Sequence, residues 1–503
     1  MDQASGDVKH AETEDPQNEQ DNRQCPQHGP APWFGCTATP DSGVTSITHA
    51  VVVPTATAAD RGAPTPPVAP RATGRDTLPV SPSSGVERVE AQSAPLRREL
   101  GLTDLVLTQI LYVVGLSWVG VAAKLGTAQI PFWLAAMALF YLPQAAVVVY
   151  LSRRFPLEGG LYQWAKLGLN GGIAFLVGWN LWIYAIVLLG TIGLAIANAL
   201  IYAIGPRAAW LSGNHVFIGA VSGVVLEALV IVSILGLRVS KWVHNSGALL
   251  LLTAFAFLLV LPLINVARGT LREYHPLTIT TPAITLLNAN IFGKLAVGAL
   301  SGFEYVAVLA GEARDAQRTI AKSVIVAAPI IALMFILGTS AVQALVPPGQ
   351  VDLVGPIPQA FRLGLGSSGV AAILIPFAVM AVSARTIANS SVLFTATTRM
   401  PMVAGWDGLI PVWFSTLHPR YRTPVNSVLF IGACALIFAA AGMINVGEQE
   451  AFQLLDNAAG ILYGLTYLVL FAVPIVGLAR TGQRAPRWIA VAAAAGFATT
   501  SST

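Results

Sequence analysis

The chain has 503 residues, of which 54% are hydrophobic and only 11% are charged. Soluble domains carry about 25% charged residues, so this composition excludes a soluble globular protein and indicates an integral membrane protein. The net charge is +4, and the basic residues are spread over short loops, which argues against a nucleic-acid partner. The three cysteines, Cys25, Cys36 and Cys434, imply neither a disulfide framework nor a zinc site. We therefore expect the lipid bilayer as a partner and no cofactor.

The first 96 residues differ in kind from the rest of the chain. They are rich in Pro, Ala, Thr, Ser and charged residues, and they show neither helical nor strand periodicity. Because such a composition cannot bury a core, residues 1–96 are predicted to be a disordered cytoplasmic tail, or to result from a misassigned start codon. Residues 97–503 are predicted to form the transmembrane domain.

Long apolar runs then alternate with short polar loops, which predicts an all-α, multi-pass membrane protein. The ten predicted spans form a core over 104–479 and lie near 104–125, 131–152, 172–204, 214–236, 244–267, 290–311, 321–346, 368–396, 424–442 and 453–479. A partial eleventh span is expected over 487–503. One set of alternating loops contains sixteen Lys and Arg residues and the other contains four. By the positive-inside rule, the N-terminus is therefore expected in the cytoplasm.

The first and sixth predicted spans carry similar short patterns, YVVGLSWVG and LAVGALSGFE. Each places a Val-Gly pair, a serine and a second glycine in an apolar stretch, and the halves that begin with them would have opposite orientations. Glycines at matching places in two inverted halves point to helices broken at a transporter's binding site, where backbone groups are free to bind a ligand. They could instead only let helices pack closely. The candidate substrate-binding residues at these breaks are Val114, Gly115, Leu116, Ser117, Trp118, Ser301, Gly302, Phe303 and Glu304.

Charge within a membrane span is costly and is usually functional, and the two main candidates here are Glu304 and Arg385, with Glu227 of the fourth span more simply explained by a polar bond to a neighbouring helix. Glu304, on the sixth span, could hold a substrate ammonium, carry a coupling proton or pair with another buried group. Arg385, in the eighth span, is too far from either surface to reach water, so it must face the interior of the bundle. No nucleophile–base pair, metal cluster or phosphate loop stands out in the sequence, so we do not expect an enzyme.

Three longer stretches resemble the amino acid–polyamine–organocation permeases: residues 153–182, which begin RRFPLEGGLYQW, residues 298–323, which begin GALSGFEYV, and residues 398–427, which begin TRMPMVAGWDG. The resemblance implies a leucine-transporter-like 5+5 inverted repeat with 11–12 spans. It also implies a secondary transporter of amino acids or related amines in the cell membrane. Two places depart from the family pattern: Asp315-Ala316-Gln317-Arg318 stands where Asn-Pro-x-Arg is common, and the first glycine motif is less tight.

In the fold implied by this resemblance, the eighth span packs against the break in the first span, where sodium-coupled relatives bind an ion. Here Arg385, flanked by Ser383 and Thr386, is expected to occupy the place of the ion, with free carbonyls near Gly115 and the carboxylate of Glu304 as partners. A structural ion pair and a ligand for a substrate carboxylate are the alternatives. An arginine keeps its proton, so coupling to a proton, or exchange, is expected rather than coupling to sodium. A nutrient sensor acting through the tail, or a polyamine-selective carrier, are the alternative functions.

Overall fold

The computed structural model describes residues 82–281, 283–366, 371–441, 448–478, 482 and 484–503, which are mainly helical. The tail up to residue 81, with Cys25 and Cys36, lies outside the described residues. In chain order the helices are α1 (Pro82–Ser93), α2 (Leu102–Val113), α3 (Leu116–Ala123), α4 (Gln129–Ala136), α5 (Leu142–Arg154), α6 (Leu161–Gly168), α7 (Gly171–Gly190), α8 (Ile192–Ile204), α9 (His215–Leu235), α10 (Leu237–Ala267), α11 (Leu286–Gly293), α12 (Phe303–Val308), α13 (Ala316–Leu345), α14 (Pro356–Leu365), α15 (Ala371–Thr397), α16 (Arg399–Trp406), α17 (Val425–Ala441), α18 (Glu448–Ala472) and α19 (Arg487–Ser502).

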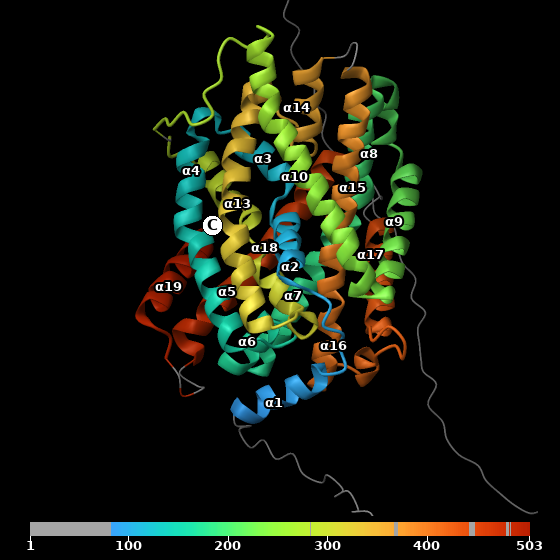
Figure 1. Cartoon of the computed structure of the whole chain (residues 1–503), viewed down its shortest axis with the longest axis vertical. Helices are drawn as coiled ribbons and strands as arrows, with labels where there is room; N and C mark the ends of the chain where they lie inside the picture. The colour runs from blue at the N-terminus through green and yellow to red at the C-terminus, as the bar shows by residue number, and fades with distance from the viewer. Residues whose placement is uncertain (1–81, 282, 367–370, 442–447, 479–481, 483) are drawn as a thin grey trace, which may run out of the picture. The chain divides into compact units, whose positions relative to one another are not determined.

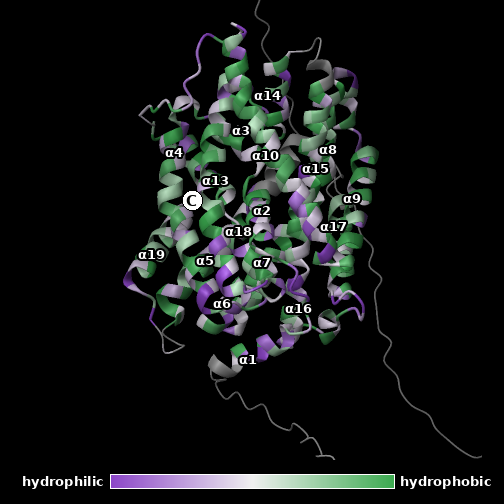
Figure 2. Ribbon diagram, viewed as in Figure 1, coloured by the Kyte–Doolittle hydropathy of each residue, from purple (hydrophilic) through white to green (hydrophobic). Residues whose placement is uncertain are grey.

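The helices agree with the predicted pattern of spans. Within the described residues, eight continuous helical segments are long and apolar enough to cross a membrane, and the bent pair α2–α3 makes a ninth. A shorter apolar helix, Val425–Ala440, lies in the ninth predicted span, and α19 lies in the partial eleventh. Hydrophobic residues cover the long helices, whereas hydrophilic residues gather around α1, α6 and α16 (Figure 2). The result is a multi-pass helical bundle.

The first and sixth spans are broken, as the glycine pattern predicts. The first bends by 44° between α2 and α3, at Val114 and Gly115. In the sixth, α11 continues into a π-helical turn, Lys294–Ala299, and the chain then leaves the helix before α12 begins at Phe303. Gly302 has φ +130°, a conformation that only glycine adopts readily, and a Cβ there would lie 2.7 Å from the ring of Tyr112. The two breaks therefore lie against each other.

The last part of the predicted tail, from residue 82 onward, contains helix α1. The prediction of disorder is wrong for this part. α1 lies across the end of the bundle near α6 and α16, opposite α14 (Figure 1). Val89 and Leu96 are buried, and Arg88 donates to the carbonyl of Trp406 at 2.6 Å. A few apolar side chains within a polar segment are enough to hold this short helix against a preformed surface, where periodicity alone gives no signal.

Candidate functional site

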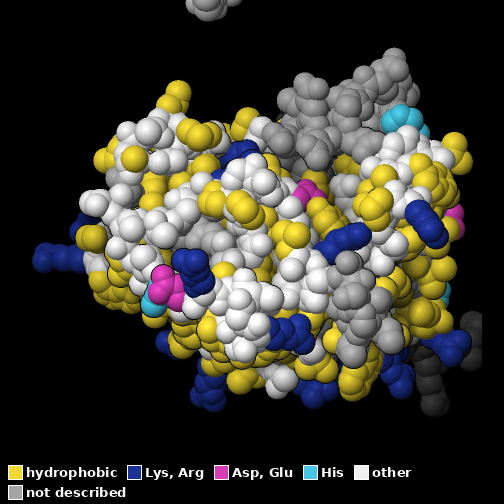
Figure 3. Space-filling view, turned by 90° about the horizontal axis from the view of Figure 1, so that it is seen from above, with side chains coloured by type: hydrophobic (Ala, Val, Ile, Leu, Met, Phe, Trp, Pro, Cys, Tyr) yellow, Lys and Arg dark blue, Asp and Glu magenta, His cyan; other side chains and the backbone are white. Residues whose placement is uncertain are grey.

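A cavity of about 210 Å³ lies between the two breaks and the helices α7, α8, α15 and α18. Among its lining residues are Gly115, Leu116, Ser117 and Trp118 from the first break and Ser301 from the sixth. It also reaches Val354, Gly355 and Pro358, at the end of the bundle where α14 begins. On the face seen from that end, acidic side chains are few (Figure 3). The broken helices thus surround a space, and it extends toward one end of the bundle.

Trp118 lines the cavity, and its indole ring leaves no room for a side chain at two nearby glycines. A Cβ at Gly115 would lie 2.4 Å from Cδ1 of Trp118, and a Cβ at Gly298 would lie 2.6 Å from its Cη2. The indole therefore fills the space between the two broken spans, and it can do so only because neither glycine carries a side chain. Trp118 separates the spans at the cavity and narrows the space open to a ligand.

Arg385 spans the junction between α15 and the first break. Its Nη2 donates to the carbonyl of Leu111 at 2.9 Å and to that of Val114 at 2.6 Å, and the residue is only 5% exposed. Because α2 ends at Val113, these two carbonyls lie where the helix no longer supplies amide donors. Thr386 lines the cavity beside it, whereas the hydroxyl of Ser383 bonds to the carbonyl of Val379 within its own helix.

Glu304 does not pair with Arg385, contrary to the expectation from the sequence. Its carboxylate, 0% exposed, accepts hydrogen bonds from the hydroxyls of Tyr463 and Tyr467 and from Nε2 of Gln144 at 3.2 Å. These donors come from α18 and α5, far from α12 in the sequence. Among the described residues, no ion pair joins Glu304 to a cation. The carboxylate therefore ties three helices together from behind the wall of the cavity.

The remaining predicted residues lie just outside the cavity. The amide of Gly302 donates to the hydroxyl of Tyr467 at 2.7 Å, and Phe303, fully buried, packs against the ring of Tyr141. Sequence reasoning missed other lining residues: Tyr112, Tyr184, Tyr463 and Asn389. Asn389 could have been found, because it follows Arg385 by four residues and so shares its helix face. The tyrosines carry no such signal, since aromatic residues in apolar spans are ordinarily packing residues.

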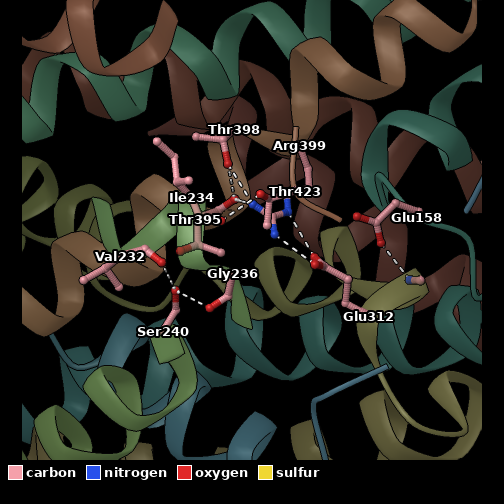
Figure 4. Close-up of polar contacts among 11 residues, drawn as sticks. Glu158, Val232, Ile234, Gly236, Ser240, Glu312, Thr395, Thr398, Arg399 and Thr423 are labelled. Carbon is pink, nitrogen blue, oxygen red and sulfur yellow. Dashed lines mark hydrogen bonds and ion pairs between the residues drawn. The ribbon is translucent and has the colours of Figure 1, made fainter. Parts of the chain in front are cut away.

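A second buried polar cluster surrounds Arg399 at the start of α16, and its contacts are drawn in Figure 4. Arg399, 0% exposed, donates from Nε and Nη2 to the two carboxylate oxygens of Glu312 at 3.0 and 2.9 Å. Its Nη1 bonds to the carbonyl of Thr395 and the hydroxyl of Thr398. These bonds join the end of α15 and the start of α16 to the loop after α12.

Glu158 adds a second carboxyl to this cluster. It is 1% exposed, Oε2 accepts the amide of Gly311 at 2.7 Å, and Oε1 is buried without a hydrogen-bond partner. Burial and the neighbouring carboxylate of Glu312 raise the pKa of Glu158 well above 4.5, against the opposing charge of Arg399. Glu312 forms the ion pair with Arg399, whereas Glu158 accepts the amide of Gly311.

Comparison with known proteins gives one consistent picture. Residues 100–501 match the family model described as amino acid permease. The chain is 24% identical over 385 residues to an uncharacterised transporter of Legionella pneumophila, covering 75% of this chain and 81% of that protein. It is 23% identical over 397 residues to the branched-chain amino acid permease BcaP of Bacillus subtilis (73% and 81% covered). It is also 23% identical over 389 residues to the low-affinity putrescine importer PlaP of Escherichia coli (72% and 80% covered).

Among solved structures, the chain is similar to MhsT in complex with L-phenylalanine. The TM-score is 0.61 at 13% sequence identity, and the match covers 81% of this chain and 98% of that chain. At this identity the similarity concerns the fold alone.

Proposed function

Because this chain belongs to the amino acid permease family, we propose that it is a secondary transporter that carries an amino acid across the cell membrane by alternating access, without coupling to sodium. The family and the leucine-transporter-like fold, both expected from the sequence, are confirmed by the family match and the structural match. The chain is accordingly a transporter and not an enzyme.

The contact of Arg385 with the first break carries the proposal that sodium is not used. Nη2 of Arg385 fills the junction between α15 and the break and occupies the carbonyls of Leu111 and Val114. A fixed guanidinium there repels a second cation, and at low dielectric this repulsion is large over a few ångströms. Because arginine does not release its proton under ordinary conditions, it cannot serve as the coupling proton carrier either. Uptake is then driven by a proton bound elsewhere or by exchange.

The direction of the cavity supports alternating access. The cavity extends toward the end at which α14 begins, and the cluster around Arg399 closes the other end. We assign the α1 end to the cytoplasm, because the basic residues gather in the loops of that end. This assignment makes the conformation outward-facing and places the N-terminus in the cytoplasm. Transport then requires the bonds between Arg399 and Glu312 to separate.

A nutrient sensor finds no support in these comparisons, since the named relatives are transporters. A polyamine carrier is the more serious alternative, because one relative is a putrescine importer. It is disfavoured by the cavity, in which Arg385 is the only charged side chain among the described lining residues. A cationic amine would need a carboxylate that this surface does not offer.

The test is uptake by the purified chain in proteoliposomes. Labelled L-leucine and L-phenylalanine serve as probes, with external sodium replaced by choline, and with and without an inward proton gradient or internal unlabelled amino acid. We expect equal uptake in sodium and choline, and stimulation by one of the other two conditions. Uptake that depends strongly on sodium would refute the proposal.

A further inference from the structure

Two residues of α15 that line the cavity, Arg385 and Asn389, each carry one buried polar atom without a partner. Nε of Arg385 is a hydrogen-bond donor, Oδ1 of Asn389 is an acceptor, and each is buried with no hydrogen-bond partner. Both residues line the cavity. Buried polar groups are nearly always satisfied, so two orphans of opposite type at one cavity point to a ligand that satisfies both.

The spacing of the two residues on α15 fits the head group of an amino acid. Residues four apart on a helix lie on one face with about 5–6 Å between their Cβ atoms. An amino acid carries its carboxylate and its ammonium on the same carbon, so the two groups are separated by a similar small distance. A guanidinium donor suits the carboxylate, and an amide oxygen suits the ammonium.

The charge of the cavity limits the ligand further. Nη2 of Arg385 is used by the carbonyls of Leu111 and Val114, which satisfies hydrogen bonds but does not neutralise the positive charge. No acidic residue is among the described lining residues, and the carboxylate of Glu304 lies behind Tyr463 and Tyr467. A ligand carboxylate would supply the missing negative charge, whereas a second ammonium group would meet only repulsion.

Much of the remaining wall is apolar or aromatic, and its polar side chains are the neutral hydroxyls of Ser117, Thr191, Ser301, Thr386 and Ser390. Tyr112, Trp118, Tyr184, Leu188 and Ile192 all line the cavity. This surface accepts an apolar side chain, and among the described lining residues it offers no carboxylate for a cationic one.

From these observations we propose that α15 itself holds the zwitterionic head group of the substrate, with Arg385 binding the carboxylate and Asn389 binding the ammonium. The pair would select amino acids with uncharged, apolar side chains and exclude polyamines and cationic amino acids. The inference rests on the proposed function and deepens it, because it names the substrate class and adds Asn389 as a binding residue.

The first measurement is binding to the purified full chain of a panel of the twenty amino acids and putrescine, by calorimetry. The tightest binder is then compared with two analogues: the amine that lacks its carboxylate and the acid that lacks its ammonium. For L-leucine these are isoamylamine and 4-methylpentanoate. We expect a neutral apolar amino acid to bind most tightly, isoamylamine not to bind, and 4-methylpentanoate to bind more weakly than leucine.

The second measurement uses variants of Asn389. Asn389→Ala should weaken binding of the amino acid by about ten- to a hundredfold, the usual worth of a hydrogen bond to a charged group, and leave binding of 4-methylpentanoate unchanged. Asn389→Asp places a carboxylate one turn from Arg385, so it should reduce binding of the neutral amino acid and increase binding of L-lysine or putrescine. Asn426→Ala is the matched control, because its amide bonds to the carbonyl of Trp413 away from the cavity.

The outcomes separate this inference from the proposed function. Tightest binding of lysine, arginine or putrescine by the unmodified chain would overturn the inference. If Asn389→Ala weakens binding of the amino acid and of 4-methylpentanoate equally, the inference is also overturned, because a structural role of Asn389 predicts that result. Failure of the unmodified chain to bind 4-methylpentanoate would overturn it as well. If leucine is transported but Asn389→Ala changes nothing, the inference fails and the permease stands. If no amino acid is transported at all, the proposed function itself fails.

Discussion

Replacing Glu312 with alanine tests the closure at the α1 end of the bundle. The change removes two charge-assisted hydrogen bonds from the guanidinium of Arg399, which is 0% exposed. Removing one partner of a buried ion pair costs about 3–5 kcal/mol, because the other charge stays buried. Arg399 would keep its bonds to Thr395 and Thr398, and Glu158 beside it could ionise in compensation. We therefore expect a loss near the lower end, about 3 kcal/mol in the free energy of unfolding.

The assay is equilibrium unfolding in mixed micelles with increasing SDS. A double-mutant cycle with Arg399→Met isolates the pair: the double variant should be more stable than Glu312→Ala alone, since no uncompensated cation remains. Arg318→Ala, which removes an exposed pair with Asp315 at 3.9 Å, is the control and should cost less than about 1 kcal/mol. Wild-type stability in Glu312→Ala, or additive effects in the cycle, would refute this account of the closure.

Three further changes test other parts of the chain. Because the pKa of Glu158 is raised in the folded state, this residue stabilises the fold below pH 4.5, and the stabilisation is lost as the pH rises through the elevated pKa. The unfolding midpoint of the unmodified chain should therefore fall from pH 5 to pH 9, and Glu158→Gln should make this fall smaller. Gly302→Ala, at φ +130°, should reduce substrate binding in calorimetry at least tenfold, whereas Gly223→Ala, with open space around its Cβ, should not. Arg385→Ala should lose most uptake, and sodium should partly restore substrate binding, whereas the unmodified chain should show no sodium effect on either.

Much of the fold is readable from the sequence, because in a membrane each span must satisfy its own backbone and is therefore a long apolar run. The two glycine patterns locate the breaks at Gly115 and Gly302, where the structure has them. The short helix α1 was missed, since its stability comes from contact with the bundle and not from its own periodicity.

The partners of buried charges are harder to predict, because they depend on how helices are rotated about their axes. The sequence placed Arg385 and Glu304 within spans but could not show which groups face them. Glu304 is satisfied by residues 160 and 159 positions away, Gln144 and Tyr463. A tyrosine in an apolar span gives no sign that its hydroxyl will meet a carboxylate.

The buried charges are compensated in different ways, and the differences indicate which of them change during transport. Glu304 is surrounded by neutral donors from two other helices, and Arg399 has a carboxylate of its own in Glu312. Two groups are left over: Arg385, whose charge meets only carbonyls, and Glu158, which has one buried oxygen without a partner. A substrate carboxylate would neutralise the first, and the raised pKa of the second favours its protonated form. Arg385 lies at the cavity and Glu158 lies near the opposite end of the bundle. We therefore expect the charge at Arg385 to be neutralised when substrate binds, and Glu158 to ionise when it becomes exposed to water.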